Sequence, residues 1–508
     1  MKNFYPNVKR TGDATKFSRA WPDNRAAAQL LRELEQIPFP SRRSSPLNQL
    51  CAAGAEYGWQ QLQRTMQKSL FQQVSAKAQA SLRRHLQRTL AQITAPCLGL
   101  EWKSFILAMQ SLGLAEASSE STERMFLRER PSYRMGLLFR RFPVLARLWV
   151  LAIGQWCNHI GEVLQRVRKD CSASSRLFFN NCSLGRIVDM RAGLSDPHHG
   201  GRSVTYLEFE RGRIIYKPRS GRSEIAWFDL LQWMNSQRFA PKLRAARVVE
   251  RRSYSWMEYV EAASCKDLAA VQRFYQRLGG MIAAAYLLKA VDCHRENVIA
   301  AGESPVLVDV DALWHVSRVT KTQSLADVLY RTGFFPNSRR RSLQSRSSVL
   351  GRSRTGKHLA RIGGRPVVAS DYAEEIVYGF SLGWECLMGT PARRAVLRKR
   401  LRHIRAHSRR WIYLATAKYV AIRQASVSPA ALQSEAAREA LLKRLSARSS
   451  VRRSVIQSEI KALRQLDLPY FVRQTTQAMP PDPRTVPIEL TDAIRKALRW
   501  TVGRRHKS

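Results

Sequence analysis

Residues 195–220, SDPHHGGRSVTYLEFERGRIIYKPRS, contain the stretch that decides the fold class. Within it, SVTYLEFE and RIIYKP are rich in β-branched and aromatic residues, and a short turn at Arg211-Gly212 separates them. Two such runs joined by a glycine-containing turn predict a β-hairpin. We therefore expect a small antiparallel sheet to begin here, with Lys217 at the end of a strand.

Apolar residues recur at helical spacing on both sides of this hairpin. Before it, the pattern runs from about residue 24 to residue 170, as in AAAQLLRELEQI and FPVLARLWVLAIGQWCNHIGEVLQRV. After it, the pattern returns in residues 268–291 and again from residue 371, where it continues through RWIYLATAKYVAI. The sequence therefore predicts an α+β fold with long helical additions at both ends. The expected sections are a helical section 1–170, a core 171–335, a basic Ser/Arg-rich loop 336–370 and a helical section 371–508.

The chain is strongly basic, with 85 Lys+Arg against 39 Asp+Glu and a formal charge of +46. Such a charge favours polyanions or acidic peptides as partners, but it does not choose between them. Residues 338–365 carry nine Lys/Arg and no acid, and their Ser, Gly and Arg side chains cannot build a core. We interpret this run as a mobile or solvated loop.

Composition also predicts the cellular compartment. The 508 residues are 44% hydrophobic and include 12 Trp, which is ample material for a globular core. The eight Cys show no repeated CxxC spacing, so neither a disulfide scaffold nor a zinc ribbon is expected. The first residues are polar and basic, and the most apolar stretch, 143–156, is interrupted by Arg147. We expect a cytoplasmic protein without a signal peptide or a membrane span.

The parts needed for phosphoryl transfer occur in order along the chain. Such a transfer needs a Lys for the phosphates, metal-binding oxygen ligands and a residue that orients the nucleophile. Lys217 ends the strand RIIYK, the position at which protein kinases hold their phosphate-contacting Lys. Taken alone, this residue would more often be an exposed Lys at a strand end.

The hexapeptide DCHREN supplies the second part. Asp292 lies five residues before Asn297, which is the spacing of the nucleophile-orienting Asp and the metal-binding Asn in the kinase catalytic loop. His294 between them gives the form Asp-x-His-x-x-Asn, which resembles the loop of lipid kinases. The alternative is a helix-capping Asp beside a solvated His.

The third part is the apolar run VLVDVDALW, which we expect to form a strand with Asp309 and Asp311 at its end. Asp309 lies twelve residues beyond Asn297, where kinases place a metal-binding Asp. Carboxylates on alternate strand residues share one face and suit one divalent cation. The alternative is a turn at a strand end, but coincidence of all three parts in kinase order is improbable. GxxxxGK[ST] is absent from the sequence, so a P-loop enzyme is excluded.

Several longer segments resemble one family. From about residue 143 to residue 471, the chain is similar to the dehydratase domain of class II lanthipeptide synthetases. The matching segments are SDPHHGGRSVTYLEFERGRIIYKPRS, WMEYVE, FYQRLGGMIAAAYLLKAVDCHRENVIAAGESPVLVDVDALWH, VLYRTGFFP and LDLPYF. The resemblance implies a lipid-kinase-like core elaborated by helices, with ATP and Mg²⁺ as cofactors. It also implies a precursor peptide whose Ser and Thr are phosphorylated and then dehydrated.

The resemblance assigns roles to matching residues. It implies that Lys217 contacts the ATP phosphates and that Asp292 and His294 serve hydroxyl activation and transfer. The implied ligands of metal or nucleotide are Asn297, Asp309 and Asp311. Asp196 and His198, in SDPH, match an Asp-x-His pair beside the nucleotide and phosphopeptide site; without the resemblance they would be taken as a tight turn.

The family also carries an elimination motif, roughly Arg-x-x-x-Arg-x-Thr-x-x-Tyr, in a segment expected to be helical. Here RWIYLATAKY supplies Arg410, Thr416 and Tyr419. A guanidinium grips phosphate bidentately, so Arg410 suits the elimination step. On sequence alone Arg410 would be a solvated helix residue.

The chain departs from the family pattern at four points. Asp311 replaces a Glu, Ser195 replaces the Gly of GDPH, and Leu414 replaces the second Arg of the elimination motif. Full-length members continue into a zinc-dependent cyclase, whereas this sequence ends at Ser508 without those ligands. The expectation is a dehydratase without its own cyclase, served by a separate cyclase and an export transporter.

Two alternatives remain open at this point. One is a kinase-like phosphotransferase that acts on a small molecule or peptide without eliminating phosphate. The other is a basic nucleic-acid binder, which the charge of +46 favours. No RRM, KH, helix-turn-helix or zinc-finger pattern supports the second alternative, so no specific nucleic acid is expected as a partner.

Overall fold

A computed structural model describes most of the chain. The described residues are 24–37, 45–113, 126, 131–313, 325–336, 348–351, 355–405, 409–448, 451–473 and 487–502. The chain forms two compact units: Met1–Pro218 with Leu414–Pro469, and Arg219–Tyr413 with Tyr470–Ser508. The boundary at Pro218 falls inside the section 171–335 that the sequence predicts to be one core.

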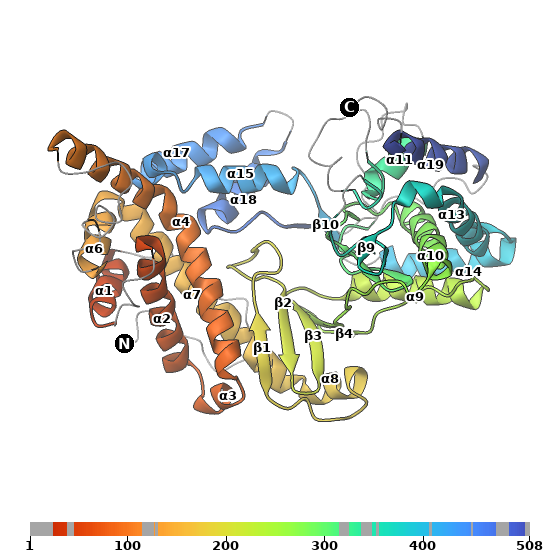
Figure 1. Ribbon diagram of the computed structural model, residues 1–508, viewed down its shortest axis with the longest axis horizontal. Coiled ribbons are helices and arrows are strands. Elements are labelled where there is room, and N and C mark those ends of the chain that lie inside the picture. The colour runs from red at the N-terminus through yellow and green to blue at the C-terminus, as the bar shows by residue number, and fades with distance from the viewer. Residues whose placement is uncertain are drawn as a thin grey trace. The chain divides into compact units, whose positions relative to one another are not determined.

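The first unit begins with the predicted helical section. Its helices are α1 (Asn24–Glu35), α2 (Pro46–Thr65), α3 (Lys68–Gln72), α4 (Ala76–Ser111), α6 (Pro131–Arg141), α7 (Pro143–Lys169) and α8 (Cys171–Phe178). Helices α2, α4 and α7 lie side by side (Figure 1). Small residues allow this approach: a Cβ at Gly54 of α2 would lie 2.3 Å from the ring of Trp149 on α7. The Trp149 indole N–H in turn donates to Thr94 Oγ1 on α4 at 2.8 Å.

The sheet of the first unit confirms the predicted hairpin. Strands β1 (Ile187–Arg191), β2 (Thr205–Phe209) and β3 (Gly212–Lys217) are antiparallel in sequence order. Phe209 pairs with Gly212, so two residues form the turn between β2 and β3. Lys217 ends β3, as the sequence predicts.

A second helical group completes the first unit. It comprises α15 (Thr416–Ala425), α16 (Pro429–Leu432), α17 (Glu435–Ser446) and α18 (Arg453–Arg464). Its core contains four buried aliphatic residues: Ile422, Leu442, Ile460 and Leu463. Leu414, which replaces the family's second Arg, packs its apolar side chain against this core.

The second unit contains helices and short antiparallel pairs. Its helices are α9 (Arg222–Ser236), α10 (Leu268–Leu287), α11 (Leu325–Thr332), a 3₁₀ turn (Ala369–Tyr372), α13 (Ala373–Met388), α14 (Pro391–Arg405) and α19 (Pro487–Val502). The strand pairs are β4 (Val248–Glu250) with β5 (Ser255–Glu258), β6 (Val298–Ala301) with β7 (Ser304–Leu307), β8 (Arg361–Ile362) with β9 (Arg365–Pro366), and β10 (Arg409–Trp411) with β11 (Phe471–Arg473).

Helices α10 and α13 form the centre of the second unit and lie side by side (Figure 1). A Cβ at Gly279 would lie 2.1 Å from the carbonyl oxygen of Ile376, and one at Gly379 would lie 1.8 Å from that of Gln276. The two backbones approach so closely that only glycine fits at these positions. Helix α10 leads directly toward the hexapeptide that begins at Asp292.

Two expectations about local structure are wrong. Strand β7 ends at Leu307, so Asp309 and Asp311 lie in irregular backbone rather than on a strand. There, the carbonyl of Asp311 accepts the backbone N–H of Arg410, and the carbonyl of Ala312 accepts that of Val291. Arg410 itself lies on β10 rather than on a helix. In both places, pairing with residues distant in the sequence replaces the expected element.

The basic loop expected over residues 336–370 is described only in part. Residues 337–347 and 352–354 lie outside the described residues, and the β8–β9 pair lies in the remainder. Among the helices that the structure describes, none is both long enough and apolar enough to cross a bilayer. Helices and antiparallel strands are both present, as predicted, whereas the lipid-kinase-like arrangement stays a prediction.

Candidate functional site

The hexapeptide 292–297 forms a tight turn in the second unit. Asp292 has a left-handed backbone with φ of 68°, which is rare for a residue with a side chain and is concentrated at functional sites. The side-chain amide of Asn297 stabilises the turn by donating to the Asp292 carbonyl at 2.8 Å. His294 Nε2 lies 3.4 Å from Asp292 Oδ1. The turn thus gathers all three predicted residues at one place.

Arg219 holds the two carboxylates that follow β7. Its guanidinium donates to Asp309 and lies 3.7 Å, at Nε, from Asp311 Oδ2. The same guanidinium donates to Glu224 Oε2 at 2.9 Å, and the Glu224 side chain is only 1% exposed. Burial by itself would lower the pKa of the Arg219 guanidinium. The negative charges of Glu224, Asp309 and Asp311 together have the larger effect and raise this pKa well above its ordinary value.

Asp311 is more enclosed than Asp309: their side chains are 9% and 31% exposed. Its Oδ2 accepts the Tyr470 hydroxyl at 3.2 Å. Burial raises the pKa of Asp311 to about 6, and the neighbouring Asp309 acts in the same direction. Arg219 and Arg410 act against this rise by stabilising the ionised form.

Arg410 lies among the residues predicted for phosphoryl transfer. Its Nη1 is 3.4 Å from Asp292 Oδ2 and 3.9 Å from Asp311 Oδ2. The guanidinium also faces the ring of Tyr470, with 5.5 Å between its Cζ and the ring centroid. Burial opposes the charge on Arg410, yet Asp311 and Asp292 raise the pKa of the guanidinium. The side chain is 15% exposed, so the expectation of a solvated helix residue is wrong.

The structure therefore gathers six of the ten predicted site residues in the second unit: Asp292, His294, Asn297, Asp309, Asp311 and Arg410. We call them the acid–arginine cluster. The other four belong to the first unit: Asp196, His198, Lys217 and Thr416.

Lys217 is buried, with 4% of its surface exposed. The alternative of an exposed Lys at a strand end is therefore wrong. A Lys is seldom buried without a partner for its charge.

Asp196 and His198 lie in the loop between β1 and β2, and both are half-buried. His198 Nδ1 is 2.7 Å from the carbonyl oxygen of Leu468. Because a carbonyl only accepts, Nδ1 carries the proton in this contact. Ser195, which replaces the family's Gly, accepts the Val204 backbone N–H at its hydroxyl, at 2.9 Å. The substitution therefore adds a contact within this loop.

Thr416 is the first residue of α15 and is half-buried. Tyr419, one turn further on, is 5% exposed and donates its hydroxyl to the fully buried Glu459. Arg448 binds the same Glu459. Tyr419 therefore belongs to a polar network in the core of the first unit.

Sequence reasoning did not single out Arg219, Tyr470 and Asp467. Arg219 and Tyr470 hold carboxylates of the acid–arginine cluster, and Asp467 binds the loop that carries Asp196 and His198. A signal was present, because these residues belong to the segments YKPRS and LDLPYF that carry the family resemblance.

The donor set fits a hard divalent cation in its chemistry. Asn297, Asp309 and Asp311 offer amide and carboxylate oxygens, the ligands that Mg²⁺ prefers. Within the part of the chain that the structure describes, no three His, Cys, Asp or Glu side chains form a metal-binding group. Mg²⁺ is commonly held by one or two carboxylates together with substrate phosphates and water, so a larger protein cage is not required.

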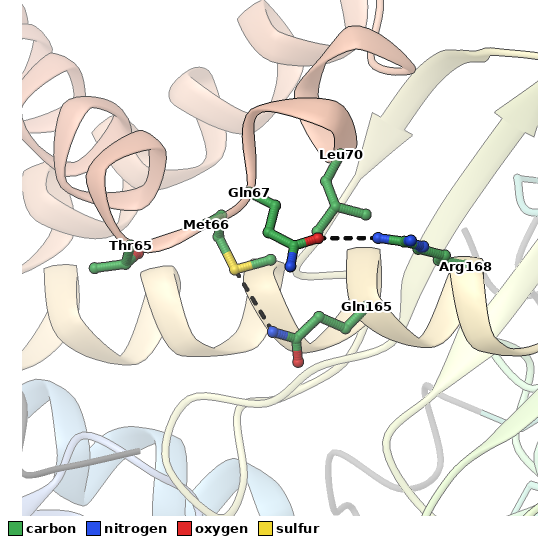
Figure 2. Close-up of a pocket in the computed structure, with 6 residues that line it drawn as sticks. All are labelled: Thr65, Met66, Gln67, Leu70, Gln165 and Arg168. Carbon is green, nitrogen blue, oxygen red and sulfur yellow. Dashed lines mark hydrogen bonds between the residues drawn. The ribbon is translucent and has the colours of Figure 1, made fainter. Parts of the chain in front are cut away.

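A separate pocket of about 280 Å³ lies in the first unit. Figure 2 shows its lining: Thr65, Met66, Gln67, Leu70, Gln165 and Arg168. Arg168 donates to Gln67 Oε1 at 3.0 Å, which ties α7 to the start of α3. None of the predicted site residues lines this pocket, and we assign it no function.

A family model described as "Domain of unknown function (DUF4135)" matches residues 142–361 and 351–474. These ranges cover more than half of the 508 residues, and the chain belongs to this family. All ten predicted site residues, from Asp196 to Thr416, lie inside the matched ranges.

The chain is also similar to a protein of Lactococcus lactis subsp. lactis named "Lacticin 481/lactococcin biosynthesis protein LcnDR2". The two are 22% identical over 190 residues, which is 36% of this chain and 20% of that protein. The match thus spans a fifth of the length of this relative.

Proposed function

We propose that this protein is a lanthipeptide dehydratase. It phosphorylates Ser and Thr of a precursor peptide with ATP and then eliminates the phosphate, which leaves dehydroalanine or dehydrobutyrine. The proposal is supported by the resemblance of the motifs to class II lanthipeptide synthetases. The similarity to a protein named for lacticin 481/lactococcin biosynthesis supports its peptide-modifying part.

One observation carries the mechanistic part of the proposal: Arg410 contacts Asp292 and lies near Asp311. Asp292 is the residue proposed to orient the substrate hydroxyl, and Arg410 is the residue proposed to hold the peptide phosphate. A phosphate formed beside Asp292 is therefore already within reach of the guanidinium. A dehydratase needs this proximity, because both reactions occur at the same Ser or Thr.

In the first reaction, Asp292 would orient the Ser or Thr hydroxyl and take its proton, as the hydroxyl oxygen bonds to the γ-phosphorus of ATP and ADP leaves. When bound, ATP would supply the phosphoryl group and Mg²⁺ would supply charge neutralisation; Asn297, Asp309 and Asp311 would hold the metal. Lys217 binds the ATP phosphates. Phosphoryl transfer depends mainly on such positioning and charge, so these residues suffice without a covalent intermediate.

In the second reaction, a base takes the Cα proton, the electron pair of that bond forms the Cα=Cβ double bond, and the Cβ–O bond breaks to release inorganic phosphate. Arg410 stabilises the negative charge that grows on the departing phosphate. The enclosure of Arg410 strengthens this interaction, because a buried charge is less screened by water than an exposed one. The family resemblance assigns Thr416 to the same step.

The experiment that tests the proposal is incubation of the chain with ATP, Mg²⁺ and a candidate precursor peptide, followed by mass spectrometry. Loss of one water per modified residue demonstrates dehydration. Gain of phosphate without water loss supports the kinase-like phosphotransferase instead. An unchanged peptide, with intact ATP, contradicts both.

Two variants test the assignment of the site. Asp292→Asn keeps the shape of the side chain but removes the acceptor charge, and Lys217→Met removes the ammonium group while keeping an apolar stem. Each should lower phosphorylation by about 10²-fold or more, the usual cost of removing a transition-state contact. Glu296→Gln changes an exposed acid in the same hexapeptide and serves as the matched control. Equal phosphorylation by all three variants and the parent contradicts the assignment.

A further inference from the structure

The loop that carries Asp196 and His198 is bound by a single buried carboxylate. Gly200 donates its backbone N–H to Asp467 Oδ2 at 2.6 Å, and Gly201 donates to Asp467 Oδ1 at 2.8 Å. Each carboxylate oxygen thus accepts one of two consecutive N–H groups. Asp467 is 2% exposed and belongs to the same unit as the loop.

The backbone of this loop needs such support. His199, Gly200 and Gly201 have φ values of 51°, 89° and 76°, so three consecutive residues are left-handed. This conformation is unfavourable for His199, which has a side chain. It also turns two neighbouring N–H groups toward one point, where an anion satisfies both. The Asp467 carboxylate occupies that point.

The residue after Asp467 holds the loop at a second place. The Leu468 backbone N–H donates to the Pro197 carbonyl at 2.8 Å, and the Leu468 carbonyl accepts from His198 Nδ1 at 2.7 Å. Two adjacent residues therefore bind both the backbone and the imidazole of the Asp196–His198 segment. The second contact selects the protonated nitrogen of the ring, which leaves Nε2 as the accepting nitrogen of a neutral His198.

We propose that Asp467 is a positioning residue for Asp196 and His198. Its ionised carboxylate closes the Gly200–Gly201 turn and thereby fixes the pair in the geometry that the reaction uses. This inference rests on the proposed function, in which the pair lies beside the nucleotide and phosphopeptide. Asp467 acts through the loop, so it is not itself a catalytic residue.

The choice of an acid at this position supports a positioning role. Burying a carboxylate is costly unless its oxygens are hydrogen-bonded, and both oxygens of Asp467 are. Two N–H groups require two acceptors, and only a carboxylate offers both oxygens in this fork. An Asn would turn its own NH₂ toward one of the glycine N–H groups and leave that group without an acceptor. The loop therefore requires the acid specifically.

The test compares Asp467→Asn with the control Asp189→Asn. Asp189 is another buried acid of the same unit, on β1, and it pairs with the exposed Arg191. Hydrogen exchange measured by mass spectrometry should show faster exchange of residues 197–204 in Asp467→Asn only. Turnover of the precursor peptide should fall by about 10²-fold, in kcat more than in KM, because a misplaced group costs rate before it costs binding. Asp189→Asn should keep the parent's turnover.

A double-variant cycle separates positioning from a general loss of stability. If Asp467 acts through Asp196 and His198, then Asp467→Asn should cost less than threefold in a background that carries both Asp196→Ala and His198→Ala, because coupled residues are not additive. A full additional loss of about 10²-fold in that background overturns the proposal. So does an Asp467→Asn variant with the parent's kcat.

Failure of the positioning inference can be distinguished from failure of the proposed function. A parent chain that modifies no peptide contradicts the dehydratase proposal. Hydrogen exchange then decides the positioning inference alone. Faster exchange confined to 197–204 supports it, and exchange equal to that of the parent overturns it.

Discussion

The guanidinium of Arg410 lies 3.4 Å from the carboxylate of Asp292, although 118 positions separate the two residues in the chain. The backbone N–H of Arg410 also donates to the carbonyl of Asp311 at 3.0 Å. Both the side chain and the main chain of Arg410 are therefore fixed on the acidic residues of the second unit. A substitution at Arg410 should therefore disturb Asp292 and Asp311 as well as the proposed phosphate contact.

Arg410→Ala should lower elimination more than phosphorylation, but it should affect both. Loss of the phosphate contact should slow elimination by about 10²-fold. Loss of a partner for Asp292 should slow phosphorylation by about tenfold, since one charge-assisted contact is worth about 1.4 kcal/mol. Phosphopeptide should accumulate, as seen by mass, and chemically phosphorylated peptide supplied with nucleotide and Mg²⁺ should remain unconverted.

Val472→Thr, at an exposed position paired with Arg410 in β10–β11, is the control. Dehydration equal to that of the parent would show that Arg410 has no role in elimination.

Removal of divalent cations should abolish the reaction. Asn297, Asp309 and Asp311 are oxygen ligands, which suit Mg²⁺ or Mn²⁺ rather than softer metals. EDTA treatment should stop ATP-dependent phosphorylation, and returned Mg²⁺ should restore it. Asp309→Asn should raise the Mg²⁺ concentration that gives half-maximal rate by about tenfold, the lower end of the cost of disturbing a metal site. Full activity in EDTA without added metal would exclude these residues as ligands.

Arg219→Met should destabilise the second unit strongly. The substitution leaves Glu224, with a side chain 1% exposed, without its guanidinium partner. Breaking a buried ion pair in this way costs about 3–5 kcal/mol. Arg222→Met removes an exposed partner of Glu250 and should cost less than about 1 kcal/mol. Urea unfolding of both variants measures the difference, and equal midpoints would show that the Arg219 pair adds nothing to stability.

Gly279→Ala should disrupt the packing of α10 against α13. The added methyl group would lie 2.1 Å from the Ile376 carbonyl oxygen, so the helices must separate, at a cost of about 1–3 kcal/mol or more. Gly154→Ala is the matched helical control, because its Cβ would meet no atom within 4 Å. That change should stabilise α7 by about 0.5–1 kcal/mol. Thermal unfolding that ranks the two variants the other way would contradict the close helix packing.

Stability should depend on pH through Asp467. Burial raises the pKa of this carboxyl from 3.8 to about 6, although the glycine N–H groups, Arg202 and Arg423 oppose the rise. A raised pKa means that the folded protein binds the proton more tightly than the unfolded chain. The contribution of Asp467 to stability is therefore greatest below pH 3.8 and falls as the pH rises to about 6, by about 3 kcal/mol in all. The parent should lose this amount relative to Asp467→Asn over that interval in denaturant unfolding. A constant difference between the two proteins would show that the pKa is not raised.

Local sequence patterns predicted the elements whose contacts are short in range. Alternating β-branched residues around Arg211-Gly212 predicted the β2–β3 hairpin, and helical spacing predicted the front helices and α10. The five-residue spacing paired Asp292 with Asn297, and in the structure the Asn297 amide donates to the Asp292 carbonyl. These patterns succeed because neighbouring residues alone decide periodicity and turn geometry.

The same patterns failed where a distant segment supplies the hydrogen bonds. Asp309 and Asp311 follow an apolar run that predicts a longer strand, but the backbone beyond Leu307 bonds to Val291 and Arg410 instead. Arg410 lies in a segment with helical spacing, yet it pairs with Val472 across β10–β11. A local pattern contains no information about partners that are dozens of residues away.

The sequence by itself determined the set of chemical groups: an acidic turn, two further carboxylates, a strand-end Lys and an Asp-x-His loop. Only the tertiary structure decided which charges meet. Arg219 donates to Asp309, Arg410 lies beside Asp292, and Asp467 reaches back 266 positions to Gly201. The physical reason is that a buried charge must find its partner in space, and folding, rather than sequence spacing, brings those partners within hydrogen-bonding distance.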